Sequence, residues 1–481
     1  MPILRVWAFA ALTYPSKGTN MRQRALTISI MAILALALAA CNSTGLPDVA
    51  TPTPKTEPTT AGRAEATATV PDIAEAPSAT PRVEAGTPPP SATKGTAPDA
   101  NADANTKLLL QIEKDTAKLR GLTPQKDVPE QFITEDQLRE NLTKDMAAEY
   151  SKTEAAQDAN ELWLLRMIPD PSIDLYQLYI DLQTEQVAGY YDPKKDELFV
   201  RSDGGPLSPS SRETLAHEFT HALQDQHYDL DKMLPSDTTD DDGSLAVRAL
   251  VEGDATISGL LYARSYMSQK DYNTMIEESK NAPTDVLDKA PRYIRDNLYF
   301  PYQQGVEFVI QLGILDSFAG ANKALQDPPV STEQILHPEK YINSPRDLPK
   351  PVALPPLTDT LGTDWTMTSN GTLGEYDFQI ILEENNASKA ETAAAGWGGA
   401  IYNHYENADK ALVMVNTVWD TKTDANEFEA AMKQSFSKDK KDGDFWTDGK
   451  RFFALKPTGD TIAFGAATDR TALEKAMAQI K

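Results

Sequence analysis

The chain has 481 residues but only one cysteine, Cys41, and five histidines. One cysteine excludes an internal disulfide framework and any zinc or iron–sulfur site built from several thiolates. Basic residues are also few, 46 Lys and Arg against 71 Asp and Glu, which gives a formal net charge of −25. This balance argues against a nucleic-acid partner, because phosphate binding depends on basic patches. Any metal site in this protein must therefore use histidine and carboxylate ligands.

The only long apolar run, "ALTISIMAILALALAAC", ends at Cys41. It is short for a transmembrane span, follows two arginines and closes with small residues, which is typical of a signal peptide. Its ending, Leu38 to Cys41, resembles a bacterial lipobox, in which the cysteine is lipidated. The resemblance implies that residues 1–41 are a signal peptide, with Met21 as a candidate start. The alternative is an uncleaved anchor with an inert thiol.

Residues 42–105 are rich in Ala, Thr, Pro and Ser and contain no aromatic residue. Such a segment cannot bury enough apolar area to offset the entropy lost on ordering. We therefore expect a disordered tether between the anchor and the folded part.

The next region predicts mostly helices. Apolar residues at helical spacing begin at Leu108, and Thr134 followed by Gln137 forms a capping-box pattern before a second helix. The segments "VAGYYDP" and "ELFVRS" predict a β-hairpin. Long helices are expected from about Ser211 and over "SLAVRALVEGDATISGLLYAR", with further helices at about 265–280 and 300–318.

The predicted secondary structure changes from mostly helices to strands and helices after a proline-rich stretch that ends near residue 358. The segments 376–384, 397–405 and 410–420 are predicted as strands, followed by a helix, two more strands and a final helix. This pattern indicates a separate α+β region with a largely antiparallel sheet.

Two of the histidines form the pattern His217-Glu218-x-x-His221. On a helix, residues i and i+4 share one face, so both imidazoles can point at one Zn²⁺. Glu218 lies beside them without ligating, where it can take a proton from water and pass it to a leaving amine. The alternative is a surface helix that carries two incidental histidines.

A catalytic zinc site needs a third protein ligand, and the sequence offers two candidates. Glu252 is a carboxylate in an otherwise apolar helix, where it is costly unless it is paired or binds metal. His227 has the offset of the third histidine of metzincins, but Gln224 replaces the glycine that turns the chain back there. Since the helix would carry His227 away, Glu252 is favoured.

These residues resemble the gluzincins, the HExxH-plus-Glu metallopeptidases. "HEFTHALQD" is similar to the active-site helix of thermolysin-like peptidases, and "LVEGDAT" resembles the glutamate helix of aminopeptidase N-type enzymes. Residues 301–305, "PYQQG", resemble the segment in which those enzymes keep a transition-state tyrosine. The resemblance implies zinc ligands at His217, His221 and Glu252. It also implies Glu218 as the general base and Tyr302 as an oxyanion donor.

The resemblance covers about residues 185–345 and departs from the family in three places. The separation between the second histidine and Glu252 is longer, with an acidic segment as the apparent insertion. Gln304 replaces the lysine of the tyrosine segment, and no aminopeptidase-type exopeptidase motif is present. The chain also looks like a group of little-characterised bacterial lipoproteins and surface proteins classed as metallopeptidases.

Together these features predict an α+β protein, with a mostly helical zincin-like metallopeptidase domain and a smaller α+β domain with a largely antiparallel sheet. The zinc domain is expected at 185–357 and the accessory domain at 358–481. Residues 106–184 are either the N-terminal helical part of the catalytic domain or a pro-segment.

The expected function is that of a zinc metallopeptidase, lipid-anchored at Cys41 on the outer face of the bacterial cytoplasmic membrane or at the cell surface. It would hydrolyse a peptide or protein substrate with zinc-activated water and Glu218 as base. Two alternatives stay open: a zincin-fold binding or scaffold lipoprotein without turnover, and a non-peptidase zinc hydrolase. The sequence makes no prediction of oligomeric state.

Several weaker features complete the analysis. Residues 197–202, "ELFVRS", are interpreted as the edge strand on which zincins lay an extended peptide. The aspartates of 237–242 are predicted to form a solvated acidic loop rather than a Ca²⁺ site. Asp225 is either a partner of the second zinc-helix histidine or exposed. His337 is interpreted as structural or surface-exposed, and His404 carries no argument.

Overall fold

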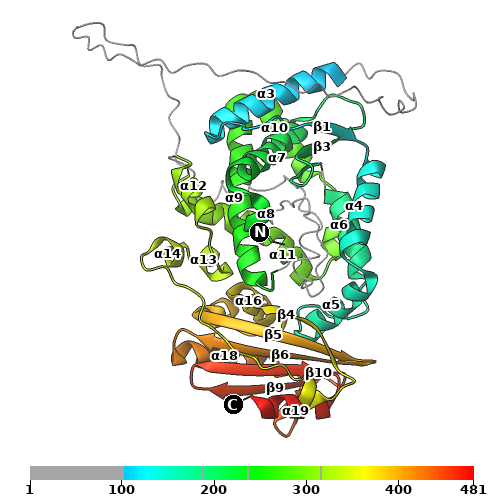
Figure 1. Cartoon of the computed structure of the whole chain (residues 1–481), viewed down its shortest axis with the longest axis vertical. Helices are drawn as coiled ribbons and strands as arrows, with labels where there is room; N and C mark the ends of the chain where they lie inside the picture. Colours follow the sequence, from blue (N-terminus) through cyan, green and yellow to red (C-terminus); the bar gives the residue numbers. More distant parts are fainter. Residues whose placement is uncertain (1–101, 187, 236–237, 315–316, 481) are drawn as a thin grey trace, which may run out of the picture.

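The computed structural model describes residues 102–186, 188–235, 238–314 and 317–480. The described chain is a mixed α/β structure with a largely antiparallel sheet in its C-terminal region, as Figure 1 shows. The predicted signal peptide, the predicted lipidation site Cys41 and most of the predicted tether lie outside the described residues. Within the described ranges, no helix combines the length and apolarity needed to cross a membrane.

Helices dominate the chain before the C-terminal sheet. In chain order, the helices and strands of this part are α3 (Ala102–Arg120), β1 (Glu130–Ile133), α4 (Glu135–Glu149), α5 (Lys152–Leu164), α6 (Leu175–Gln186), β2 (Gly189–Asp192), β3 (Glu197–Arg201), α7 (Pro209–Tyr228), α8 (Leu230–Met233), α9 (Asp241–Tyr266), α10 (Gln269–Lys280), η1 (Leu287–Lys289), α11 (Arg292–Gln311), α12 (Ala319–Gln326), α13 (Thr332–Leu336) and α14 (Pro338–Ile342).

Side-chain caps explain where the main helices begin. The predicted capping box of α4 is confirmed, because Thr134 and Gln137 each bond the backbone N–H of the other. Ser208 caps α7, with Pro209 in the first turn, where its missing N–H costs nothing. Asp240 caps α9 by accepting from the N–H of Gly243.

The prediction of a solvated acidic loop at 237–242 is wrong for its second half. Asp240 is the N-cap of α9, and Asp241 and Asp242 belong to the first turn of that helix and are buried. Oδ1 of Asp242 accepts hydrogen bonds from the N–H and hydroxyl of Thr332, 3.0 and 2.6 Å away. Acidic residues are stabilised at a helix N-terminus by its exposed N–H groups and dipole, and for this reason a run of aspartates can begin a helix.

A small sheet of three strands has the order β1-β3-β2. The predicted hairpin is confirmed as the antiparallel pair β2 and β3, but the interpretation of residues 197–202 as an edge strand is wrong. Strand β1 pairs in parallel with the other side of β3, which places β3 in the centre. The edge nearest the helix of the HExxH motif is therefore β2.

Helix α9 packs against both α7 and α11, and glycines allow the second of these contacts to be close. A Cβ atom added at Gly305 of α11 would overlap the carbonyl oxygen of Ala249 in α9. A Cβ added at Gly253 of α9 would overlap the Gly305 backbone in return. The "EGDAT" and "PYQQG" segments therefore lie in direct backbone contact, and only glycine fits at these two positions.

The C-terminal region contains a seven-stranded antiparallel sheet of order β4-β5-β6-β10-β9-β8-β7. Its elements are α15 (Thr358–Leu361), β4 (Thr366–Thr372), α16 (Glu375–Glu384), α17 (Ala390–Ala394), β5 (Trp397–Asn407), β6 (Lys410–Trp419), α18 (Lys422–Ser435), β7 (Lys440–Asp442), β8 (Phe445–Thr447), β9 (Phe452–Thr458), β10 (Thr461–Ala467) and α19 (Arg470–Gln479). The strands predicted at 397–405 and 410–420 are confirmed as β5 and β6.

The strand predicted at 376–384 is wrong, because these residues form α16. The N–H of Gly374 donates to the carboxylate of Asp377 at 2.9 Å and begins the helix. Phe378, Ile381 and Leu382 are buried at i, i+3 and i+4, which is the spacing of one helix face. A short apolar run of this kind fits a buried helix as well as a strand.

Alternation along β6 gives the sheet two buried faces. Val413 and Val415 join a core that contains Phe428 of α18, whereas Leu412 and Met414 join a smaller core beside α19. The first of these cores extends into the helical part of the chain, so the two parts are packed together along a continuous apolar contact. The exact domain division at 357/358 stays a prediction.

Candidate metal centre

The structure brings together the three side chains that the sequence favoured as metal ligands. Nε2 of His217 and Nε2 of His221 lie 2.9 Å apart, on the face of α7 that meets α9. One carboxylate oxygen of Glu252 in α9 lies 3.2 Å from the first nitrogen and 3.5 Å from the second. All three side chains are buried, so the three ligand atoms converge in a closed space.

The polar atoms around this point lack hydrogen bonds of normal geometry within the described chain. Oε1 of Glu218 is buried and forms no hydrogen bond within the described chain, and the buried hydroxyl of Tyr302 and Oε1 of Glu252 form none of normal geometry, although these two side chains interact with each other. Buried polar atoms are almost always hydrogen-bonded, so three such atoms in one place indicate room for a polar occupant. Two imidazoles and a carboxylate are the ligand set of catalytic zinc sites, and the residues therefore fit the metal.

Burial sets the protonation of the ligands in a way that suits metal binding. It lowers the pKa of His217 to about 4, so this imidazole is neutral at pH 7 and keeps a lone pair. Burial also acts to raise the pKa of the Glu252 carboxyl, but the two imidazoles outweigh it and hold this pKa below its usual value. The site therefore presents a neutral His217 imidazole and an ionised Glu252 carboxylate.

Glu218 lies beside the ligands and also reaches strand β2. Its Oε2 accepts a hydrogen bond from the backbone N–H of Tyr191 at 3.2 Å. Burial, and then the charge of Glu252, raise the pKa of Glu218 well above its usual value. Two carboxylates of one site thus have pKa values that their surroundings shift in opposite directions, which is typical of groups with different chemical roles.

Tyr302 lies at the same centre, although α11 begins at Arg292 and the proline before the tyrosine is inside the helix rather than at its start. The ring of Tyr302 lies 6.5 Å from that of His217, centroid to centroid. Burial, together with the charges of Glu252 and Glu218, raises the pKa of Tyr302, so its hydroxyl keeps its proton. The close contact between Gly253 and Gly305 is what brings this tyrosine against Glu252.

The alternative ligand His227 lies away from the centre. Its Nε2 is 2.8 Å from the carbonyl oxygen of Thr123, and its Nδ1 is 3.4 Å from the side-chain amide of Gln125. Helix α7 continues to Tyr228, as the sequence predicted, and carries His227 to the surface. Asp225 also has other partners, the hydroxyl of Tyr191 at 3.0 Å and the N–H of Leu230.

The partner of His221 is Gln224, which sequence reasoning noted only as a replaced glycine. Oε1 of Gln224 lies 2.8 Å from Nδ1 of His221, while its Nε2 donates to the carbonyl of Val251 and to Asp254, at 3.0 and 2.8 Å. Two acceptors for the NH₂ group fix the orientation of the amide. Nδ1 of His221 must then carry the proton, which leaves the lone pair of Nε2 directed at the ligand point.

A buried ion pair supports this arrangement from the other side. Asp254 accepts from Nε and Nη2 of Arg120 at 3.1 and 3.0 Å, and both side chains are fully buried. Arg120 belongs to α3, 134 positions before Asp254 in the sequence. A local sequence pattern cannot predict a contact between residues so far apart in the chain. Of the two residues, only Asp254 belongs to a segment that the sequence analysis had singled out, "EGDAT".

Two further buried charged residues beside the centre were also missed. Arg248 lies one turn before Glu252 in α9; burial lowers its pKa to about 10, against the opposing effect of Glu252 and Tyr302. Glu213 lies one turn before His217 in α7, packed against Gly259. Burial raises the pKa of Glu213 well above its usual value, which keeps the carboxyl neutral. Arg248 lies in the same apolar helix as Glu252, which is the signal that singled out Glu252.

A second group of potential ligands has a different character. Glu333, Asp347 and Asp420 also bring carboxylate oxygens within 4.8 Å of one another. The ammonium group of Lys340 lies among them, at 2.7 Å from Glu333 and 3.0 Å from each aspartate. The lysine therefore already supplies the positive charge that these carboxylates require.

The remaining histidines have structural partners. Nε2 of His337 lies 2.9 Å from the buried carboxylate of Glu375 in α16. His404 is buried in β5, with Nδ1 2.9 Å from the hydroxyl of Thr368, and burial lowers its pKa to about 3. Neither histidine is near the candidate metal ligands in any contact that the structure records.

Comparison with known proteins bears on the C-terminal region. Residues 363–477 match a family described as a domain of unknown function (DUF8575). No curated protein and no solved structure matches the chain. The matched residues run from just before β4 into α19, so the chain is similar to this family through its C-terminal sheet, and the candidate metal centre lies outside the match.

Proposed function

We propose that the protein is a zinc metallopeptidase of the gluzincin type, with His217, His221 and Glu252 as metal ligands. The observation that carries the proposal is the convergence of these three side chains, from residues 217 to 252 on two helices, at one buried point. Glu218 and Tyr302 stand at the same point with buried polar atoms that form no hydrogen bond of normal geometry within the described chain. Together these five residues would supply three metal ligands, a general base and a hydrogen-bond donor.

In the proposed hydrolysis, the metal and three side chains of the protein have separate roles. When bound, Zn²⁺ supplies a Lewis acid that polarises the substrate carbonyl and makes water more acidic. Glu218 accepts the proton of the attacking water and returns it to the departing amine. Tyr302, which keeps its proton, donates a hydrogen bond to the oxygen on which negative charge develops. Gln224 holds the His221 ring in the required tautomer.

Strand β2 favours a peptide over other hydrolase substrates. The backbone N–H of Tyr191 points away from β3 and toward Glu218, so the edge of the small sheet that pairs with no further described strand lies beside the proposed base. Main-chain groups at a sheet edge hold extended peptides by strand addition. The edge strand that the sequence placed at 197–202 is thus supplied by β2.

The two rival functions make different predictions for the same residues. A scaffold lipoprotein without turnover requires no carboxylate beside the ligands, whereas Glu218 is buried there. A non-peptidase hydrolase would use the same metal and base but not the edge of β2. The lipid anchor at Cys41 belongs to the proposal as well, and mass spectrometry of the membrane-extracted N-terminus tests it.

The experiment that tests the enzyme proposal compares Glu218→Gln with the unaltered chain, both loaded with zinc. We expect the variant to retain one Zn²⁺ and to lose about 10²- to 10⁴-fold in the rate of hydrolysis of an unstructured protein, the usual contribution of a general base. Glu277→Gln, an exposed change on α10, is the matched control and should hydrolyse normally. Surviving turnover in Glu218→Gln would contradict the base, and lack of stoichiometric zinc would contradict the site.

A further inference from the structure

Helix α3, the first described helix, reaches the candidate metal centre through its last residue, Arg120. Nε and Nη2 of Arg120 donate to one oxygen of Asp254, Oδ2, at 3.1 and 3.0 Å. The guanidinium also lies over the ring of Phe318, 4.5 Å from its centroid. Helix α3 packs against α7 and α9, so the helix that supplies Arg120 contacts both helices that carry the proposed metal ligands.

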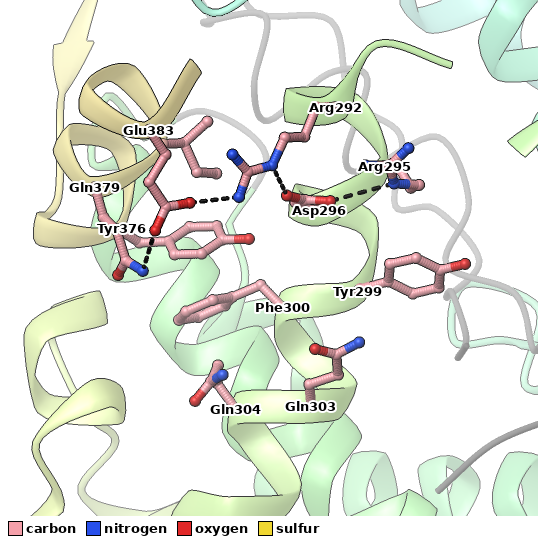
Figure 2. Close-up of a pocket in the computed structure, with 11 residues that line it drawn as sticks. Arg292, Arg295, Asp296, Tyr299, Phe300, Gln303, Gln304, Tyr376, Gln379 and Glu383 are labelled. Atoms are coloured by element: carbon pink, nitrogen blue, oxygen red, sulfur yellow. Dashed lines mark hydrogen bonds and ion pairs between the residues drawn. The ribbon is translucent and has the colours of Figure 1, made fainter. Parts of the chain in front are cut away.

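Full burial distinguishes this ion pair from others in the chain. Arg292, for example, pairs with Asp296 and Glu383 where it lines a pocket between α11 and α16, as Figure 2 shows, and its side chain is 37% exposed. The side chains of Arg120 and Asp254 are 0% exposed. Burying two charges costs free energy that their attraction need not return, and apolar residues of similar volume are often no less stable. The stability of the fold therefore does not by itself account for a charged pair at this place.

The same oxygen of Asp254 accepts a third hydrogen bond, from the side chain that orients His221. Nε2 of Gln224 donates to Oδ2 of Asp254 at 2.8 Å and to the carbonyl oxygen of Val251 at 3.0 Å. Oε1 of Gln224 is then turned to Nδ1 of His221, 2.8 Å away. Contacts of hydrogen-bond length thus join Arg120 to a proposed metal ligand through two buried side chains.

The charge of Asp254 is what fixes the orientation of the Gln224 amide. The carbonyl of Val251 lies inside α9 and also accepts a helical hydrogen bond, whereas bonds to an ionised carboxylate are about twice as strong as neutral ones. An ionised carboxylate only accepts, so it binds the NH₂ group of the amide. A carboxylate buried without a cation becomes neutral, and its O–H would donate to the amide oxygen instead. The guanidinium of Arg120 therefore selects the present orientation.

We infer that Arg120 is a positioning residue of the proposed metal centre. By keeping Asp254 ionised, it holds Gln224 in the orientation that places the proton of His221 on Nδ1, with the lone pair of Nε2 directed at the ligand point. The inference rests on the proposed function, in which His221 is a zinc ligand. It also assigns α3 to the catalytic domain rather than to a removable pro-segment, because removal of α3 would take Arg120 with it.

The first test measures the proton position of His221 without zinc. The double variant Arg120→Met with Asp254→Asn removes both charges together, so no unpaired charge stays buried, and its circular dichroism should match that of the unaltered chain. The asparagine amide can present either its carbonyl or its NH₂ group to Gln224. Two-bond proton–nitrogen NMR spectra are recorded at about pH 8, above the ordinary pKa of histidine, and His221→Gln assigns the signal. We expect the proton on Nδ1 in the unaltered chain and on both ring nitrogens in exchange in the double variant.

The second test measures zinc affinity by competition with a chromophoric chelator. We expect the double variant to bind zinc about 10-fold more weakly, the lower end of the loss for a partner behind a metal ligand. Arg120→Lys keeps the positive charge and should bind zinc as the unaltered chain does. Arg292→Met with Glu383→Gln makes a comparable change at the partly exposed ion pair of Figure 2 and should also leave zinc affinity unchanged.

The outcomes separate failure of the inference from failure of the proposed function. A proton on Nε2 of His221 in the unaltered chain, a proton on Nδ1 alone in both chains, or equal zinc affinity in both would overturn the role of Arg120 and leave the metal site standing. A proton position that changes in the double variant supports this role even if the unaltered chain binds no zinc, a result that counts against the proposed function alone. Zinc binding and hydrolysis that persist after removal of residues 102–120 would contradict the assignment of α3 to the catalytic domain.

Discussion

Two groups of side chains in this protein bring three potential metal ligands within 4.8 Å of one another, and they differ in what neutralises them. In one, His217, His221 and Glu252 converge, with a single carboxylate among two imidazoles. In the other, Glu333, Asp347 and Asp420 surround the ammonium group of Lys340. The first group is fully buried, whereas the second is partly exposed at both aspartates.

The difference lies in the charge already present. Burial acts to lower the pKa of Lys340, but the surrounding carboxylates outweigh it and raise this pKa, so the lysine stays charged. A further cation at this cluster would have to displace Lys340. At the other cluster, burial favours the neutral form of His217, and an imidazole without its extra proton is a metal ligand rather than a counter-ion.

The comparison shows that proximity of acidic and basic groups does not identify a metal site. Where a lysine lies among the carboxylates, its charge already balances part of theirs, and the ion pairs link separate segments of the chain. A cluster of two imidazoles around one carboxylate, with His217 neutral, leaves buried lone pairs that only a cation or a proton satisfies. The following predictions test this distinction.

The largest expected effect comes from removing one carboxylate from each cluster. Glu252→Gln should reduce zinc affinity by more than the about 10- to 100-fold that loss of an outer partner costs, because it removes a ligand. Asp420→Asn should leave zinc content unchanged. Metal analysis after gel filtration with limiting zinc measures both, and His227→Ala, which alters the partly exposed alternative ligand, serves as a second control. Zinc lost from Asp420→Asn or from His227→Ala, but kept by Glu252→Gln, would reverse the assignment.

The next largest effect is expected from removing the hydrogen bond that orients the His221 ring. Gln224→Met keeps the length of the side chain but removes the acceptor for Nδ1 of His221. We expect zinc affinity to fall by about 10- to 100-fold while the fold is retained. Competition with a chromophoric chelator measures the change. Gln226→Met, two residues along the same helix and bonded to the 125–126 loop instead, should bind zinc as the unaltered chain does. Equal affinity in both variants would show that Gln224 does not orient the ring.

Removal of Lys340 should reduce the stability of the fold without changing zinc binding. Lys340→Met leaves Glu333 buried without its partner and leaves Asp347 and Asp420 close together. Because the cluster is partly exposed, we expect a loss of about 1–2 kcal/mol in the free energy of unfolding, between the values for surface and buried pairs. Urea unfolding measures the loss. The lysine would not be the organising charge of the cluster if Lys340→Met were as stable as the unaltered chain.

Local sequence signals predicted the elements that carry the candidate site. The helices of His217 and Glu252 were expected because their caps, lengths and apolar spacing agree, and the structure places the three favoured ligands together. Glu252 was favoured over His227 as the third ligand by a physical argument, that Gln224 stands where a glycine would let helix α7 turn back. The structure shows His227 at the surface, as that argument requires.

What sequence reasoning missed depends on contacts between distant segments. Arg120 reaches Asp254 only because α3 packs across α7 and α9. Strand β3 is central because β1, which lies far earlier in the chain, pairs with it, as in the pair Glu130 and Leu198. Helix α16 was taken for a strand because a short apolar run that is buried on several sides loses its periodicity. In each case the deciding partner is far away along the chain.

The smallest expected effect is the pH dependence of the contact between His337 and Glu375. The hydrogen bond to Glu375, against the opposing effect of burial, raises the pKa of His337 above 6.5, with Glu339 and Glu333 as further acidic neighbours. A histidine with a raised pKa in the folded state contributes stability that is fully present below its unfolded pKa, about 6.5, and is lost as the pH rises through the folded value.

His337→Asn should therefore destabilise the protein more at pH 5.5 than at pH 9. Burial raises the pKa of Glu333 to about 7, so this carboxyl titrates in the same range and must be separated from the histidine. A double-mutant cycle of His337→Asn with Glu375→Gln, followed by thermal unfolding at each pH in excess zinc, isolates the pair. The coupling should decline with rising pH, while the Lys340 cluster, whose lysine stays charged, should show no such decline for Lys340→Met with Asp420→Asn. A coupling that is constant across the range would mean that His337 is held by packing and not by its charge.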